Sequence, residues 1–241
     1  MCGRYTFVAE DGFHYLIAGF TQKVDPRSWG SFVRRFNIAP TQTAPVIAYD
    51  PPQGVTFRWG LIPHWSKDEK IGYSMINARA ETLLEKPAFR KLVGTRRCLV
   101  PADGFYEWKK EGKKKQPFYF RMRSRKPFAF AGLWDSWKKS ETEEVHSFTI
   151  ITTAPNVLTG TVHDRMPAIL RREDLEKWLL EKDAGEAAGL LRPYEAGEME
   201  AIAVSDLVNS PKNDSPACIE EVKEAAGEKK AEEVQGGLFP E

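Results

Sequence analysis

The sequence of 241 residues has few cysteines, few histidines and no long apolar run. Its three cysteines, Cys2, Cys98 and Cys218, are too widely spaced to indicate a disulfide framework or a zinc site. The four histidines are scattered, so we expect neither a metal nor a cofactor. No stretch reaches membrane-spanning length, and the N-terminus lacks the apolar segment of a signal peptide. These absences argue against membrane and disulfide-rich secreted proteins and predict a cytoplasmic one.

Charge divides the chain into two parts. The formal net charge is +1. Residues 219–241 contain seven acidic residues and three lysines, a charge of −4, which leaves +5 on residues 1–218. We therefore predict one folded domain over residues 1–219 and an acidic, disordered tail over 220–241. A moderately basic body is compatible with nucleic-acid binding but does not establish it.

The hydrophobic pattern predicts more strands than helices. Helices are expected at 11–19, at 81–93 with an interruption at Pro87, and at 172–181. Strands are expected at 46–50, 55–60, 74–78, 97–100, 105–109, 118–122, 128–133, 147–153 and 199–205. The prediction is an α+β fold, a single domain built on a curved, barrel-like, mostly antiparallel sheet with scattered helices.

Cys2 becomes the first residue if Met1 is removed, which the small size of Cys2 makes chemically plausible. Its amine and thiol then lie on adjacent carbons and can close a five-membered thiazolidine ring with an aldehyde. In unperturbed peptides the pKa of such an amine is roughly 7.7–8.0 and that of the thiol roughly 8.5. We expect a nucleophile at Cys2; the alternative is a second residue without a role.

The segment Asn77-Ala78-Arg79-Ala80-Glu81 alternates polar and small residues. In an extended chain Asn77, Arg79 and Glu81 share one face and could bind a sugar-phosphate. The alternative is an ordinary strand edge with a salt bridge.

Glu107 lies within the aromatic segment Gly104-Phe105-Tyr106-Glu107-Trp108. Burial among aromatic rings should raise the pKa of this carboxyl and produce an acid or base that works near neutral pH. The alternative is an outward-facing glutamate on an amphipathic strand.

His163 opens the segment His163-Asp164-Arg165-Met166-Pro167. Histidine changes its charge near physiological pH. In an extended segment His163 and Arg165 point the same way, so that Arg165 could hold a phosphate through two hydrogen bonds while His163 moves protons. The alternative is a structural histidine.

Basic and aromatic residues suited to phosphates and unstacked bases recur in the first hundred positions. They are Arg4, Arg34, Arg35, Arg58, Trp59, His64, Trp65, Arg79 and Arg90. Trp59 and Trp65 flank Pro63, a rigid position suited to a stacking surface; core packing is the alternative. The lysine-rich segment 109–115 predicts a solvated hairpin turn.

In their order along the chain, Cys2-Gly3-Arg4 and the three segments around Asn77, Glu107 and His163 resemble the SOS-response-associated peptidase (SRAP) family. The segments 37–40, 204–205 and 212–213 also match, so the resemblance covers roughly residues 2–220. It implies a domain that binds single-stranded DNA and links its N-terminal cysteine covalently to the aldehyde of an abasic site. It also implies a peptidase-like removal of Met1, and a location at the nucleoid.

The resemblance implies four catalytic residues. Cys2 is the nucleophile, Asn77 orients the opened deoxyribose, Glu107 acts as acid or base beside the amine, and His163 carries a second proton. The DNA-binding residues that it implies, or that we add on charge, are Arg4, Asn37, Pro40, Trp65, Arg79, Arg90, Arg165 and Lys212.

Two other functions remain open at this stage. One is a cysteine peptidase that acts on other proteins through Cys2, Glu107 and His163. The other is a nucleic-acid-binding module in which Cys2 is incidental. If the reaction stopped at the Schiff base formed by the amine, strand cleavage would follow as a lyase-type side reaction. We expect a monomer. The tail segment with Gln235, Leu238 and Phe239 is either a docking motif for the replication sliding clamp or sequence without a role.

Overall fold

The structure, a computed structural model, describes residues 2–21, 33–48, 53–112 and 114–222. The predicted acidic tail from 223 onward, with Gln235, Leu238 and Phe239, lies outside the described residues. None of the helices in these ranges is long and apolar enough to cross a membrane. The helices are α1 (Gly12–Ile17), α2 (Arg90–Thr95), α3 (Leu175–Leu180) and α4 (Ala184–Gly189). The strands are β1 (Tyr5–Phe7), β2 (Arg35–Ile38), β3 (Thr43–Ala48), β4 (Gln53–Trp59), β5 (Asn77–Arg79), β6 (Arg97–Ala102), β7 (Gly104–Glu111), β8 (Lys114–Met122), β9 (Phe128–Lys138), β10 (Glu144–Thr153), β11 (Met166–Pro167) and β12 (Met199–Ala203).

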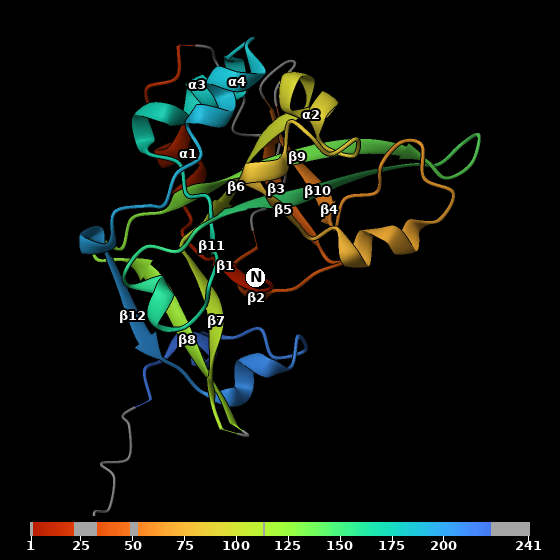
Figure 1. Cartoon of the computed structure of the whole chain (residues 1–241). Helices are drawn as coiled ribbons and strands as arrows, with labels where there is room; N and C mark the ends of the chain where they lie inside the picture. The colour runs from red at the N-terminus through yellow and green to blue at the C-terminus, as the bar shows by residue number, and fades with distance from the viewer. Residues whose placement is uncertain (1, 22–32, 49–52, 113, 223–241) are drawn as a thin grey trace, which may run out of the picture.

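Five strands close into a barrel in the order β10-β4-β3-β6-β9, because β9 also pairs with β10. All these pairings are antiparallel except β10 with β4. β5 and β11 pair with the end of β10 beyond the ring. A second, antiparallel sheet has the order β12-β8-β7-β1-β2. The two sheets lie one above the other in Figure 1, with the helices around the outer side of the barrel.

The strands of the barrel are buried on both faces, and their alternation decides which core each side chain enters. On β9, Phe128 and Phe130 join the core between the two sheets. Ala129, Ala131 and Leu133 on the same strand face the helices. The small alanines leave room for the apolar sides of α1, α2 and α3, so the same strand can carry a helix layer and close a barrel.

One buried cation ties the helix layer together. Arg97 on β6 donates hydrogen bonds to the carbonyls of Val93, Trp178, Leu179 and Glu181. These carbonyls belong to the C-terminal parts of α2 and α3, where the last turn of a helix has no partner of its own. Arg97 is therefore a shared cap for two helices.

The fold confirms the α+β prediction with a barrel-like, mostly antiparallel sheet. The strand predicted at 74–78 is shifted, because 69–74 forms the 3-10 helix η2 (Glu69–Ser74) and only β5 is extended. The helix predicted over 81–93 is wrong in its first half: residues 80–82 are a 3-10 turn, and α2 begins after Pro87. The predicted turn at 109–115 is shorter, since β7 and β8 extend into it.

Replacing Arg97 with Met is expected to lower the free energy of unfolding by about 2–4 kcal/mol, because several buried carbonyls lose their donor. The matched control is Lys91→Met on the exposed side of α2, which should change stability by less than about 0.5 kcal/mol. Urea unfolding of both variants measures the difference. Equal stabilities would contradict the capping role.

Candidate functional site

The side chain of Cys2 is buried in the core between the two sheets. It is fully inaccessible, and its neighbours in this core include Tyr5 on β1 and Trp59 on β4. The backbone at this end is held by β7, whose Tyr106 amide donates to the carbonyl of Arg4 at 3.0 Å. The thiol lies 3.9 Å from the same carbonyl. The N-terminal segment is thus part of the protein interior.

Asn77 holds Cys2 from the side of the barrel. Its Nδ2 donates to the Cys2 carbonyl at 2.8 Å. β5 places the side chain there because it pairs in parallel with β10, Asn77 lying opposite Ile150. The Asn77 Oδ1 is buried and has no hydrogen-bond partner. The Nδ2 of Asn77 is therefore occupied by the protein, whereas its Oδ1 can still accept a hydrogen bond from another donor.

Glu107 on β7 supplies a buried carboxyl that is only 2% exposed. Burial raises the pKa of Glu107 from its ordinary value to about 7. The sequence-based prediction of a raised pKa is confirmed in direction, but its reason was partly wrong. Tyr106 and Trp108 belong to a separate cluster on the opposite face of β7, as strand alternation requires, so only Phe105 shares the face of the carboxyl.

His163 faces this carboxyl from the segment after β10. Its Nε2 lies 4.0 Å from Glu107 Oε2. The Arg165 amide donates to His163 Nδ1 at 3.1 Å, and Asp164 Oδ1 lies 2.9 Å from the same nitrogen. Burial lowers the pKa of His163. The site thus pairs a neutral imidazole with a carboxyl that titrates near neutrality, a combination suited to moving protons in both directions.

The pKa of the Cys2 thiol differs from the value expected for an unperturbed cysteine. Burial first, and then the charge of Glu107, raise the pKa of the Cys2 thiol far above its ordinary value. At neutral pH the sulfur is protonated, so its attack on any electrophile needs a base that takes the proton. Glu107 is the neighbouring group with a suitable pKa.

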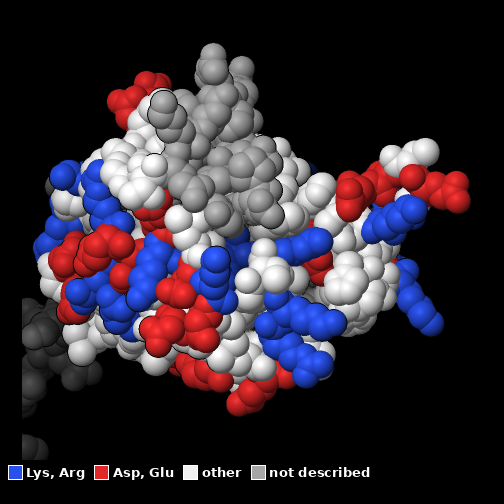
Figure 2. Space-filling model, turned by 90° about the horizontal axis from the view of Figure 1, so that it is seen from above, with Lys and Arg blue, Asp and Glu red and all other residues white. Residues whose placement is uncertain are grey.

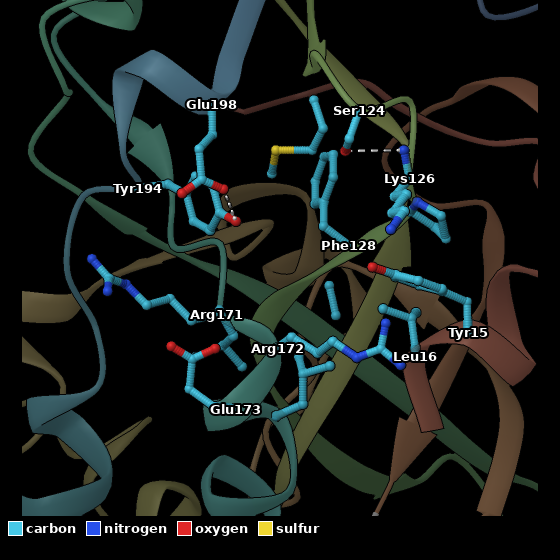
Figure 3. A pocket seen from close by; sticks show the side chains of 15 residues that line it. Tyr15, Leu16, Ser124, Lys126, Phe128, Arg171, Arg172, Glu173, Tyr194 and Glu198 are labelled. Atoms are coloured by element: carbon cyan, nitrogen blue, oxygen red, sulfur yellow. Dashed lines mark hydrogen bonds between the residues drawn. The ribbon is translucent and has the colours of Figure 1, made fainter. Parts of the chain in front are cut away.

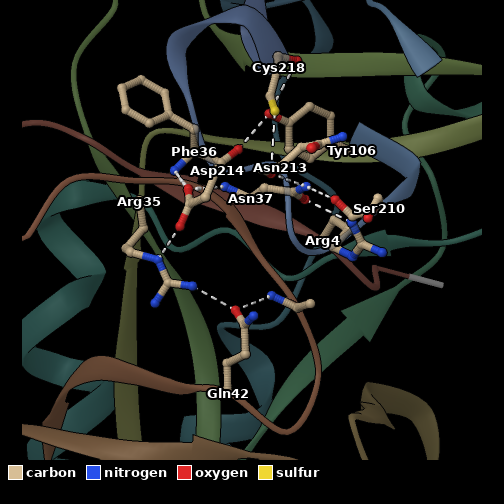
Figure 4. Close-up of polar contacts among 11 residues, drawn as sticks. Arg4, Arg35, Phe36, Asn37, Gln42, Tyr106, Ser210, Asn213, Asp214 and Cys218 are labelled. Atoms are coloured by element: carbon tan, nitrogen blue, oxygen red, sulfur yellow. Dashed lines mark hydrogen bonds and ion pairs between the residues drawn. The ribbon is translucent and has the colours of Figure 1, made fainter. Parts of the chain in front are cut away.

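Arg4 and Asn37, which the sequence assigned to the DNA surface, form an internal network (Figure 4). Arg4 Nη1 donates to Asn37 Oδ1 at 2.8 Å and to the Val208 carbonyl at 2.6 Å. Asn37 is fully buried, and its Nδ2 donates to the carbonyl of Asn213 at 2.7 Å. The surface role expected for Asn37 is therefore corrected: Asn37 is buried and joins β2 to the segment 208–213.

Arg165 is also engaged, by Glu81. Two hydrogen bonds of 2.7 and 2.9 Å join the guanidinium to both carboxylate oxygens, and a third of 2.6 Å reaches the Thr152 carbonyl. The hydrogen bonds from Arg165 lower the pKa of Glu81. This pair links the segment of Asn77 to the segment of His163, so a phosphate could use the Arg165 fork only by competing with Glu81.

The other predicted DNA-binding residues lie at the surface. The side chains of Arg79, Arg90 and Lys212 are exposed, and Pro40 is half-buried. Trp65 is 54% exposed, which is unusual for so large an apolar ring. On the face seen in Figure 2, side chains of both signs are interspersed among the described residues, so charge does not mark that face for nucleic acid.

Tyr5 is a candidate that the sequence did not reveal. Its hydroxyl is buried without a hydrogen-bond partner. Burial, followed by the charge of Cys2, raises its pKa well above the ordinary value. The ring packs edge-on against Trp59 at 5.2 Å and Phe130 at 5.7 Å. The three-residue strand β1 is too short for periodicity to predict it, and no sequence signal marked this hydroxyl.

A separate pocket of about 280 Å³ lies between α1, the turn from β8 to β9, and the segment before α3 (Figure 3). Arg172 lies over the ring of Tyr15 at 4.2 Å, and Lys126 lies 5.6 Å from the same ring. Glu173 and Glu198 line it as well. None of the four residues expected to be catalytic borders this pocket, so it is distinct from the site at Cys2.

The comparisons with known proteins agree with the fold. A family model described as SOS response associated peptidase (SRAP) matches residues 1–211. The chain belongs to this SRAP family.

Its relatives include the Bacillus subtilis abasic site processing protein YoqW, 48% identical over 226 residues that cover 91% of this chain and 99% of the relative. The Gallus gallus abasic site processing protein HMCES is 36% identical over 188 residues, 67% of this chain and 55% of that protein. A crystal structure from Bacteroides thetaiotaomicron has a TM-score of 0.80 at 32% identity, and covers 92% of this chain and 100% of that one.

Glu107→Gln is expected to stabilise the protein at high pH. The pKa of Glu107 rises from 4.5, the ordinary value for a glutamate, to about 7 in the folded state. The folded state therefore keeps a proton that the unfolded state releases, and stability falls as the pH rises through this window. Glutamine resembles the protonated acid and avoids this loss, so above about pH 7 the variant should gain up to about 3 kcal/mol.

Thermal unfolding from about pH 4 to pH 8 measures this gain, which should vanish toward the acid end. The control is Glu141→Gln in the exposed β9–β10 connection, for which no gain is expected. A constant difference between Glu107→Gln and the unmodified protein at every pH would contradict the burial of an ionisable carboxyl.

Proposed function

We propose that this protein binds single-stranded DNA and captures abasic sites covalently through Cys2, whose amine is liberated when Met1 is removed. The product is a thiazolidine that joins the N-terminal residue to the sugar and shields the lesion from strand cleavage. Supporting this proposal, Cys2, Asn77, Glu107 and His163 come from four distant segments and converge, with the Asn77 amide 2.8 Å from the Cys2 carbonyl. The names of the relatives as abasic site processing proteins agree with this substrate.

The chemistry proceeds in two steps. The Cys2 amine attacks the open aldehyde of the abasic sugar; a C–N bond forms, one water leaves, and a Schiff base results. The sulfur then adds to the same carbon, and its proton ends on the ring nitrogen. The second attack is intramolecular, with an effective molarity that can reach about 10⁵ M in well-oriented cases. Ring closure removes the C=N bond that would otherwise act as the electron sink for strand cleavage.

The proton movements fall to Glu107 and His163. As a carboxylate, Glu107 takes the proton of the buried thiol and returns it to the nitrogen, which its pKa of about 7 allows in either direction. His163 is neutral because its pKa is lowered. In this proposal it exchanges a proton with the sugar hydroxyl or the ring oxygen. Asn77 keeps the Cys2 backbone in place and offers its unpartnered Oδ1 to the opened sugar.

DNA would reach the site along exposed side chains. Arg79 follows Asn77 on β5 and is accessible to a phosphate beside the lesion. Arg90, Lys212 and Trp65 are other exposed candidates for contacts with the strand, and Arg165 contributes where a phosphate displaces Glu81. The alternative, a peptidase that acts on other proteins, has weaker support, because the relatives are named as abasic site processing proteins.

Cys2→Ala and Cys2→Ser test the capture. The protein is mixed with single-stranded DNA that carries one abasic site, and products are separated on a denaturing gel. The unmodified protein should form a stable adduct. The alanine variant keeps the amine but has no thiol, and the serine variant has a hydroxyl in its place, so both should lose the stable ring while reversible binding persists. Cys218→Ala, which alters another buried cysteine, is the control and should retain the adduct.

No adduct with the unmodified protein, or an undiminished adduct with Cys2→Ala, would refute the proposed function. Cleavage of the DNA by Cys2→Ser, in place of protection, would agree with arrest at the Schiff base.

Glu107→Gln and His163→Ala are expected to slow adduct formation by about 10²-fold or more, the usual contribution of a positioned acid or base. The rate for the unmodified protein should change with pH around 7, where Glu107 titrates. The Glu107→Gln variant should lack that inflection. Rapid-quench sampling on the same gel gives the rates, and an unchanged pH profile would exclude Glu107 from the proton transfer.

A further inference from the structure

Asp135 on β9 is a buried carboxylate outside the site at Cys2. It is 2% exposed, yet it receives four hydrogen bonds. Its Oδ2 accepts from the backbone amide of His64 at 2.8 Å and contacts His64 Nδ1 at 3.0 Å. Its Oδ1 accepts from Arg96 Nη1 at 2.9 Å and from the Ser136 amide at 2.8 Å. Burying a charge is costly unless it is paired, so this carboxylate is committed to these donors.

The two nitrogens of His64 that contact Asp135 Oδ2 belong to the loop 62–66. Other groups on the neighbouring strands hold the same loop. The Ile62 amide donates to Ser147 Oγ at 2.7 Å. The Trp137 indole donates to the Ser66 carbonyl at 2.7 Å, and the Ser66 amide closes a turn onto Pro63 at 2.8 Å. The beginning, middle and end of the loop are therefore each attached to β9 or β10, with Asp135 at the middle.

This anchoring explains how Trp65 can stand exposed. Trp65 is 54% exposed, although it directly follows the anchored residue His64. Arg96, the other partner of Asp135, lies over the Trp134 ring at 4.8 Å and is thereby oriented as well. A loop held from beneath cannot turn its tryptophan inward to bury it. Exposed aromatic rings on such fixed supports are the surfaces on which unpaired bases stack.

The loop also begins close to the proposed site. Ser147, which anchors Ile62, and Ile150, which pairs with Asn77, lie three residues apart on β10. At about 3.4 Å per residue this separation is roughly 10 Å. The loop that carries Trp65 thus starts near the part of β10 that positions Asn77.

We propose that Asp135 is a positioning residue that presets Trp65 as a stacking surface for a base of single-stranded DNA beside the captured abasic site. Asp135 does not touch the DNA; it acts through the backbone and ring of His64. The inference rests on the proposed function, since it assigns the place where the flanking strand is held. It adds an anchor, formed by Asp135, His64 and Arg96, that is independent of the proton-transferring residues.

The test separates binding from chemistry. Adduct formation is followed as a function of protein concentration in excess over an abasic oligonucleotide with several nucleotides on each side. Trp65→Ala should raise the half-saturating concentration about tenfold, as loss of one stacked base does. Asp135→Asn should raise it several-fold by the same route. The maximal rate constant should stay unchanged in both, because Cys2, Glu107 and His163 are untouched.

A double-mutant cycle decides whether Asp135 acts through Trp65. In the Trp65→Ala background, Asp135→Asn should have almost no further effect. Independent, multiplying effects would overturn the proposal, as would a fall in the maximal rate constant. His64→Ala removes only the ring contact at an exposed position and should give a smaller loss that also disappears in the Trp65→Ala background. This variant decides the question if Asp135→Asn does not fold.

The two proposals fail in different ways. Absence of any adduct with the unmodified protein would refute the proposed function. A normal adduct whose half-saturating concentration is unaffected by Trp65→Ala, or by both Asp135→Asn and His64→Ala, would refute only the role of the anchor.

Discussion

Everything at this site depends on the burial of Cys2 between the barrel and the second sheet. The Cys2 side chain lies in the main core, and its carbonyl is held by the Asn77 amide at 2.8 Å. The same burial desolvates Glu107 and raises its pKa to about 7. One constraint therefore positions Cys2 and prepares a neighbouring carboxyl that can take up a proton near neutral pH. A reactive terminus on a flexible arm would have neither property.

This arrangement has a cost in stability. An ionisable carboxyl whose pKa is raised by burial destabilises the folded state above neutral pH, and the protonated thiol needs a base before it can react. The fold offsets such costs elsewhere, with the shared helix cap at Arg97 and the network in which Arg4 and Asn37 join the first strand to the segment near residue 210.

Much of the barrel could be predicted from the sequence, because β6, β9 and β10 alternate side chains between two cores over six residues or more. β1 and β2 were missed: they span three and four residues, and their polar side chains are buried only because distant segments provide hydrogen bonds. The four catalytic candidates were found through motifs. The partners of Arg165 and Asn37 could not be, since Glu81 and Asn213 reach them only in the folded chain.

The central claim is that a liberated Cys2 uses both its nitrogen and its sulfur on one carbon of the DNA. Intact mass spectrometry of the adduct, after treatment with a hydride reductant, tests this most directly. A closed ring predicts a mass equal to the protein without Met1 plus the abasic DNA, less one water, with no hydrogen gained from the reductant. A species that still carries Met1, or one that takes up two hydrogens as a Schiff base does, would contradict the account.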